Sequence, residues 1–144
     1  MGKPSRPMKL EKSNYEALAG FRFALRSFLA FSERAAAAAG VSPQQYQAML
    51  AIKGAGGRDA LTILELSEQL LIRHHTAGEL VTRLAKQGFV VRSDDPADGR
   101  RVLVKLTAKA EKVLQGLALA HFEELQGIRP ALLSVLAQFD SEGG

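Results

Sequence analysis

The chain has 144 residues and a mass of 15.5 kDa, the size of one domain with its own hydrophobic core. Hydrophobic residues make up 47% and charged residues 24%, which argues against global disorder, and no apolar run reaches the roughly 18 residues of a membrane span. The lack of cysteine excludes disulfides, thiolate zinc sites and thiol redox sensing, while a formal net charge of +4 and a pI of about 9.6 favour polyanionic partners.

Residues 1–12 are basic, contain two prolines and are predicted to be an arm without regular structure. No apolar run follows closely enough to form a secretory signal, so we expect a cytoplasmic protein. From Asn14, apolar residues recur every three or four positions, which predicts a helix of about 25 residues that ends at Gly40.

Two capping patterns predict the helices that follow. Ser42, Pro43 and Gln45 predict a helix start, and the apolar face of that helix ends at the glycines after position 53. Thr62 and Glu65 form a second capping box, which opens a short helix through residue 71. After a tight turn another helix ends at Gly88, so the two short helices predict a helix-turn-helix.

After Gly88 the apolar residues recur at every second position, which is typical of β-strands. Residues 89–93 and 101–106 are predicted to be strands, and residues 94–100 have the composition of a turn, so together they predict a β-hairpin with a charged tip. Thr107 can cap a long helix that is expected to end near Gly127 and Pro130. Residues 131–139 predict a separate last short helix.

The predicted fold is mainly α with a small β-hairpin. Residues 1–144 form one domain, in which a winged helix-turn-helix over residues 43–107 is flanked by helices over residues 13–40 and 108–142. The flanking helices carry apolar stripes that are too wide for a small chain to bury internally, which predicts a homodimer. The apolar residues that predict this interface are Phe21, Phe28, Leu132, Leu133 and Leu136.

The start of the second helix of the helix-turn-helix carries polar side chains suited to DNA. Arg73, His74, His75 and Thr76 stand where such a helix directs its side chains at base edges in the major groove. The simpler interpretation is a solvated helix start. A metal site is a third interpretation, because His75 and Glu79 have the i, i+4 spacing of two ligands, but the sequence offers no third ligand nearby.

The hairpin tip and the charge distribution also favour contact with DNA. Arg100 and Arg101 can enter a minor groove, and Asp98 can hold the loop by accepting backbone hydrogen bonds or can orient an arginine. An ordinary charged turn is the alternative. Residues 73–112 contain nine Lys or Arg and five Asp or Glu, so they account for the whole formal excess of +4. No phosphate-binding loop or nucleophile elbow is present, and we predict neither an enzyme nor a cofactor.

The segments 61–71, 75–92 and 95–107 resemble the MarR-type transcriptional regulators. The most specific part is Asp98-Gly99-Arg100, followed by Leu106 and Thr107, which looks like the wing motif of that family. The resemblance implies a homodimer that binds double-stranded DNA at a pseudo-palindromic operator, with residues 73–83 as the recognition helix and Arg100 in the minor groove. It also implies control by a small aromatic or anionic molecule.

The predicted DNA-binding residues of the recognition helix are Arg73, His74, His75, Thr76, Glu79, Thr82 and Arg83, and those of the wing are Asp98, Arg100 and Arg101. The candidates for a ligand site are Arg22, Arg26, Tyr46 and Met49, which offer cations and apolar walls. Three residues depart from the family pattern: Arg73 replaces a capping serine, Gly78 weakens the helix, and Glu79 is acidic where a basic residue is common.

The leading functional prediction is therefore a sequence-specific DNA-binding regulator, most often a repressor. The first alternative is a winged-helix interaction module that has lost DNA binding, which Gly78 and Glu79 favour. The second alternative is an enzyme, assisted by a metal at His74 and His75.

Overall fold

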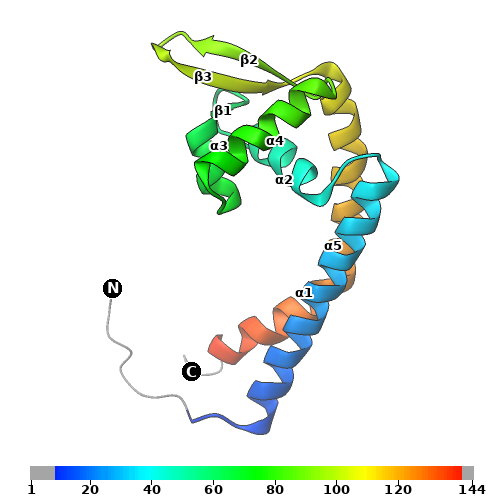
Figure 1. The fold of residues 1–144 in the computed structure, drawn as a ribbon. Helices are drawn as coiled ribbons and strands as arrows, with labels where there is room; N and C mark the ends of the chain where they lie inside the picture. Colours follow the sequence, from blue (N-terminus) through cyan, green and yellow to red (C-terminus); the bar gives the residue numbers. More distant parts are fainter. Residues whose placement is uncertain (1–8, 141–144) are drawn as a thin grey trace. The chain divides into compact units, whose positions relative to one another are not determined.

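The computed structural model describes residues 9–140 (Figure 1). Residues 1–8 of the predicted basic arm and residues 141–142 of the predicted C-terminal helix lie outside this range. The chain divides into two compact units, Met1–Phe31 with Phe122–Gly144 and Ser32–His121. Helices α1 (Lys12–Ala38) and α5 (Ala108–Asp140) each contribute residues to both units.

The first unit contains the N-terminal part of α1 and the C-terminal part of α5. The side chain of Asn14 donates to that of Gln138 over 2.6 Å, so the two helices meet at this point. The predicted break near Gly127 and Pro130 is wrong, because α5 continues through Pro130 to Asp140. A proline removes a single amide donor from the helix, and the strong helix formers on both sides of Pro130 sustain it. No described helix is apolar over enough residues to cross a membrane.

The second unit has the predicted helix-turn-helix and hairpin, together with one strand that the sequence did not reveal. Its elements between α1 and α5 are α2 (Pro43–Lys53), β1 (Ala60–Thr62), α3 (Ile63–Leu70), α4 (His74–Lys86), β2 (Val90–Asp95) and β3 (Asp98–Leu106). The sheet is antiparallel in the order β1-β3-β2. The predicted fold class, mainly α with a small sheet in a winged helix-turn-helix, is confirmed.

The predicted helix caps are present. Ser42 and Thr62 each form a complete capping box, with Gln45 and Glu65 respectively. The Thr107 hydroxyl oxygen accepts from the Ala110 amide at 3.2 Å and donates to the Gly88 carbonyl at 2.6 Å, which ties the start of α5 to the end of α4. These local bonds fix where α2, α3 and α5 begin.

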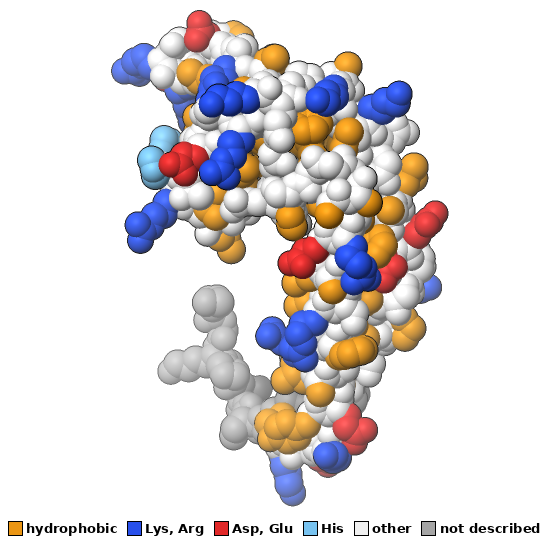
Figure 2. Space-filling view, turned by 45° about the vertical axis from the view of Figure 1, so that its right-hand side comes forward, with side chains coloured by type: hydrophobic (Ala, Val, Ile, Leu, Met, Phe, Trp, Pro, Cys, Tyr) orange, Lys and Arg blue, Asp and Glu red, His pale blue; other side chains and the backbone are white. Residues whose placement is uncertain are grey.

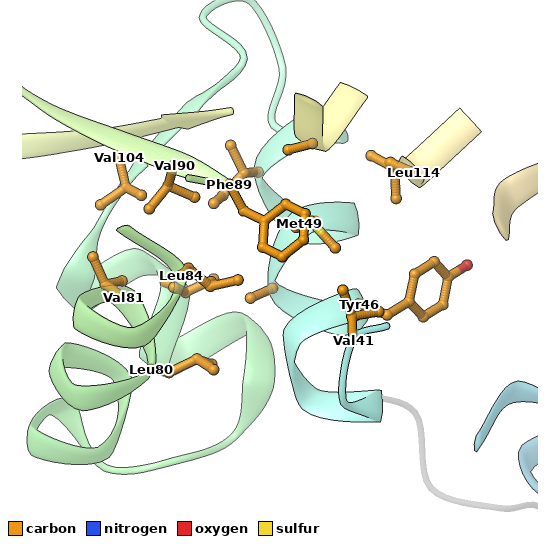
Figure 3. Close-up of a cluster of buried hydrophobic side chains, with 14 of the residues drawn as sticks. Val41, Tyr46, Met49, Leu80, Val81, Leu84, Phe89, Val90, Val104 and Leu114 are labelled. Atoms are coloured by element: carbon orange, nitrogen blue, oxygen red, sulfur yellow. The ribbon is translucent and has the colours of Figure 1, made fainter. Parts of the chain in front are cut away.

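The core of the second unit fixes the direction in which α4 faces. Met49, Ile52, Leu66 and Val104 are fully buried, and each such side chain contributes about 1.5–3 kcal/mol on leaving water. Figure 3 shows Met49 and Val104 within this core. Helix α4 buries one apolar stripe, made of Ala77, Leu80, Val81 and Leu84, and the last three belong to this core. Because this stripe is buried, the opposite face of α4 is turned to solvent.

The wing is more regular than the sequence indicated. Strands β2 and β3 extend to Asp95 and Asp98, so only Pro96 and Ala97 separate them, and the predicted loop over residues 94–100 is wrong in its length. A register shift at Asp94 and Asp95 accommodates the turn, and Asp95 accepts from the Ala97 amide at 2.9 Å. Turn-forming residues therefore continue the strands here, because pairing with the opposite strand holds them extended.

Candidate nucleic-acid interface

Helix α4 exposes a polar face that includes most of the predicted recognition residues. Thr76 is half-buried, and the exposed members are Arg73, His74, His75, Glu79, Thr82 and Arg83. Arg73 is the N-cap residue of α4 and makes no side-chain capping bond, so the helix begins without the stabilisation that α2 and α3 have.

A surface hollow of about 630 Å³ runs along this face of α4. It is lined by His74, His75, Gly78, Glu79, Thr82, Arg83, Lys86, Arg92 and Ile63. Three of these side chains are cations and one is a carboxylate, and the second unit carries further Lys and Arg side chains on the surface that Figure 2 shows. The hollow is thus shaped by α4 and lined with an excess of positive charge, which suits a phosphate-bearing partner.

Arg92 of β2 is joined to α4 through Thr82. The Arg92 guanidinium donates to the Thr82 hydroxyl oxygen over 3.0 Å, and that hydroxyl donates its proton to the Gly78 carbonyl over 3.0 Å. The Thr82 proton is therefore already used, and Thr82 serves to hold Arg92 beside α4. This contact places a wing cation at the same hollow as Arg83 and Lys86.

His75 and Glu79 are neighbours one turn apart on the exposed face. The Nε2 atom of His75 lies 3.1 Å from the Oε1 atom of Glu79, with side chains that are 84% and 57% exposed. An exposed pair of this kind adds little to the stability of the helix. Its main consequence is to present a hydrogen-bond donor and an acceptor side by side at the surface.

A second, smaller hollow of about 310 Å³ connects the helix start to the wing. Its polar lining includes His74 of α4 and Arg100 and Arg101 of β3. The Asp98 Oδ1 atom accepts from the Arg100 amide at 3.1 Å and from the Arg100 guanidinium at 3.2 Å. Both arrangements that the sequence left open for Asp98 therefore occur together.

These bonds have an electrostatic consequence for the wing. Hydrogen bonds from the backbone and then the side chain of Arg100, aided by the charge of Arg101, hold the pKa of Asp98 below its ordinary value of 3.8. Asp98 therefore remains ionised as a support for the wing. The Arg100 side chain is 92% exposed, so it extends into solvent while Asp98 holds its amide and its guanidinium Nε.

The candidate ligand residues lie in different environments. Met49 is fully buried and Tyr46 is 3% exposed in the core of the second unit, whereas Arg22 and Arg26 are exposed on α1 in the first unit. The Tyr46 ring stacks on that of His121 with centroids 4.5 Å apart, and burial raises the pKa of Tyr46 above 10.0. The ligand site stays a prediction.

Two cations of the main hollow, Lys86 and Arg92, were missing from the residues predicted from the sequence. Lys86 follows Thr82 by four positions, so helical periodicity could have placed it on the same face. Arg92 carries no comparable signal, because only the packing of β2 on α4 brings it to Thr82. No group of three or more His, Cys, Asp or Glu side chains among residues 9–140 is arranged to hold a metal ion.

Comparison with known proteins identifies relatives. The MarR family model matches residues 39–101, the segment that contains the helix-turn-helix and most of the wing. The transcriptional regulator HosA of Escherichia coli is 37% identical over 70 residues, which are 49% of this chain and 50% of HosA. The chain thus spans about half the length of the curated relatives that it matches.

Solved structures share the fold over nearly the whole chain. The structure of NadR in complex with 4-hydroxyphenylacetate has a TM-score of 0.67 at 24% identity, and the match covers 99% of this chain and 96% of that one. A mutant of MepR from S. aureus bound to an oligodeoxyribonucleotide has a TM-score of 0.66 at 17% identity and covers 90% and 98% of the two chains. At these identities the likeness shows the fold.

Proposed function

We propose that the protein is a sequence-specific DNA-binding transcriptional regulator, because the MarR family model matches residues 39–101 of this chain. The observation that carries the proposal is the hollow along α4, where recognition-helix side chains and cations from α4 and β2 meet. Helix α4 enters the major groove, Arg83, Lys86 and Arg92 bind phosphates, and Arg100 reaches the adjacent minor groove from the wing. A MepR mutant that shares the fold is bound to an oligodeoxyribonucleotide, which supports DNA as the partner.

A salt titration tests DNA binding. Each phosphate neutralised by a cation adds about −0.9 to the slope of log affinity against log salt, so a protein that uses several cations must bind duplex DNA with a steep negative slope. Selection of DNA from a random pool must then yield a pseudo-palindrome with two half-sites. A shallow slope with no selected sequence would instead favour the winged-helix interaction module.

We propose that the active form is a homodimer and that it represses. Both terminal helices expose large apolar side chains, and the α1 members are Tyr15, Leu18, Phe23 and Leu29. On α5 the corresponding side chains are Leu119, Phe122, Leu133 and Leu136. Obligate dimers bury about 2,000 Å² or more of largely apolar surface, and a second copy of the chain supplies a matching surface by symmetry. Repression is tested by transcription in vitro from the selected operator.

A small aromatic or anionic effector is also proposed, on the basis of the shared fold with NadR, whose structure holds 4-hydroxyphenylacetate. In this chain Met49 and Tyr46 are packed in the core, so a ligand reaches them only if α2 moves relative to its neighbours. Such a ligand releases DNA by favouring a different position of α4. The measurement is DNA affinity with and without 4-hydroxyphenylacetate as the first probe.

A further inference from the structure

Glu79 is an unusual residue to find on a surface that is proposed to meet DNA. It lines the main hollow together with Arg83, Lys86 and Arg92, and its side chain is 57% exposed. A carboxylate opposite a phosphate is repelled, so in a complex with DNA its position is favourable only where it meets a hydrogen-bond donor. The three cations that line the same hollow offset the repulsion between Glu79 and the phosphates of DNA.

The major groove offers few donors that a carboxylate can use. Only the N6 amino group of adenine and the N4 amino group of cytosine donate there. In adenine the N7 acceptor lies beside N6 and opposes a carboxylate, whereas cytosine presents no acceptor of its own in the major groove. Cytosine is therefore the base that suits Glu79.

His75 determines how Glu79 is presented. Its Nε2 atom lies 3.1 Å from the Oε1 atom of Glu79, and this contact favours one orientation of a side chain that otherwise has several rotamers. A carboxylate offers about four acceptor positions, so the contact with His75 leaves Glu79 able to accept a hydrogen bond from a base. The main chain does not obstruct the approach, because Gly78 beside it has no side chain and faces open space.

We propose that Glu79, positioned by His75, reads a C·G base pair in each half-site by accepting a hydrogen bond from the N4 amino group of cytosine. This inference rests on the proposed function, since it assigns a base to the same recognition helix. It also accounts for an acid on the recognition helix without invoking a loss of DNA binding.

The experiment is selection from a random DNA pool with the full chain, comparing the unmodified protein with Glu79→Gln. The unmodified protein selects a C·G pair at one position of each half-site. The variant lowers the preference for C·G over T·A at that position by about tenfold or more, the size of one good base contact, and keeps the other positions. Glu68→Gln on α3 is the control, because it removes an equally negative and exposed side chain outside both hollows.

The outcomes separate the two proposals. If neither the unmodified protein nor any variant selects a DNA sequence, the proposed function itself is contradicted. Selection in which Glu79→Gln keeps the same cytosine preference overturns only the role of Glu79. Circular dichroism of each variant verifies that the helix content is retained, as expected for an exposed position.

The role of His75 is tested by a double-mutant cycle on the same base preference, measured by fluorescence anisotropy with C·G and T·A operators. If His75 acts through Glu79, His75→Ala lowers the preference in the unmodified background and has no further effect in Glu79→Gln. An equal effect in both backgrounds would show that His75 contacts DNA independently, and the positioning role would be wrong.

Discussion

Gly78→Ala is expected to stabilise the protein and to weaken its binding to DNA. A Cβ atom at Gly78 meets no atom within 4 Å, so the substitution introduces no clash in the free protein. A glycine inside a helix is less favourable than alanine by about 1 kcal/mol, so the free energy of unfolding should rise by roughly 0.5–1 kcal/mol. For a chain of this size the melting temperature should rise by roughly 2–5 °C.

The effect on DNA has the opposite sign because Gly78 forms part of the lining of the main hollow. In the proposed complex the added methyl group occupies space into which the edge of a base fits. We expect operator affinity to fall by about 1–3 kcal/mol, the magnitude of one lost base contact. Affinity for random DNA should fall less, since phosphate contacts on Arg83 and Arg92 remain.

Gly116→Ala is the matched control for this prediction. Gly116 also lies in a helix, α5, and a Cβ atom there likewise meets nothing within 4 Å. It should give a similar gain in stability with unchanged affinity for DNA. The measurements are thermal unfolding and fluorescence anisotropy on the selected operator. Unchanged or tighter operator binding by Gly78→Ala would refute a close approach of DNA to α4 at this position.

The other predictions concern the wing, a helix cap and assembly. Asp98→Ala should weaken DNA binding even though it removes a negative charge, because both hydrogen bonds that anchor Arg100 are lost; tighter binding in an anisotropy titration would contradict the supporting role. Arg100→Ala should change the free energy of unfolding by less than about 0.5 kcal/mol and reduce the salt slope by about one, since its side chain is 92% exposed. Bonds from Thr62 and Arg58 lower the pKa of Glu65 below 4.5, so its contribution to stability is present above pH 4.5 and disappears as the pH falls through the lowered pKa; in Glu65→Gln this part of the pH dependence should vanish from denaturant unfolding curves. Sedimentation at micromolar concentration should give twice the mass of 15.5 kDa, and a single species of 15.5 kDa would refute the dimer.

The sequence predicted those elements whose signals are local. The capping boxes at Ser42 and Thr62 depend on residues three positions apart, and the buried stripe of α4 is a repeat within one helix. Likewise, the two bonds from Arg100 to Asp98 join residues two positions apart. Patterns of this range are fully contained in the sequence, which is why they predicted both the fold and the position of the wing.

Features that depend on distant partners could not be predicted in this way. Strand β1 has only three residues and is a strand because Leu61 pairs with Val104 of β3. Arg92 lines the main hollow because β2 packs beside α4, and no spacing along the chain links it to Thr82. The prediction of a helix end near Pro130 was wrong for the opposite reason. The proline is a strong local signal for termination, but the helix on both sides of it outweighed that signal.

The distribution of stabilising features within the second unit itself supports a binding role for α4. Helices α2 and α3 begin with complete capping boxes, whereas α4 begins at Arg73 without a capping bond and contains Gly78. The missing cap and the glycine each cost about 1 kcal/mol, so α4 is held in place by its buried stripe and by Thr107 at its end. Both unfavourable residues belong to the exposed side and start of the helix, not to the stripe that packs. Local rules of stability are broken where a surface serves another purpose, and here the break coincides with the face that is proposed to meet DNA.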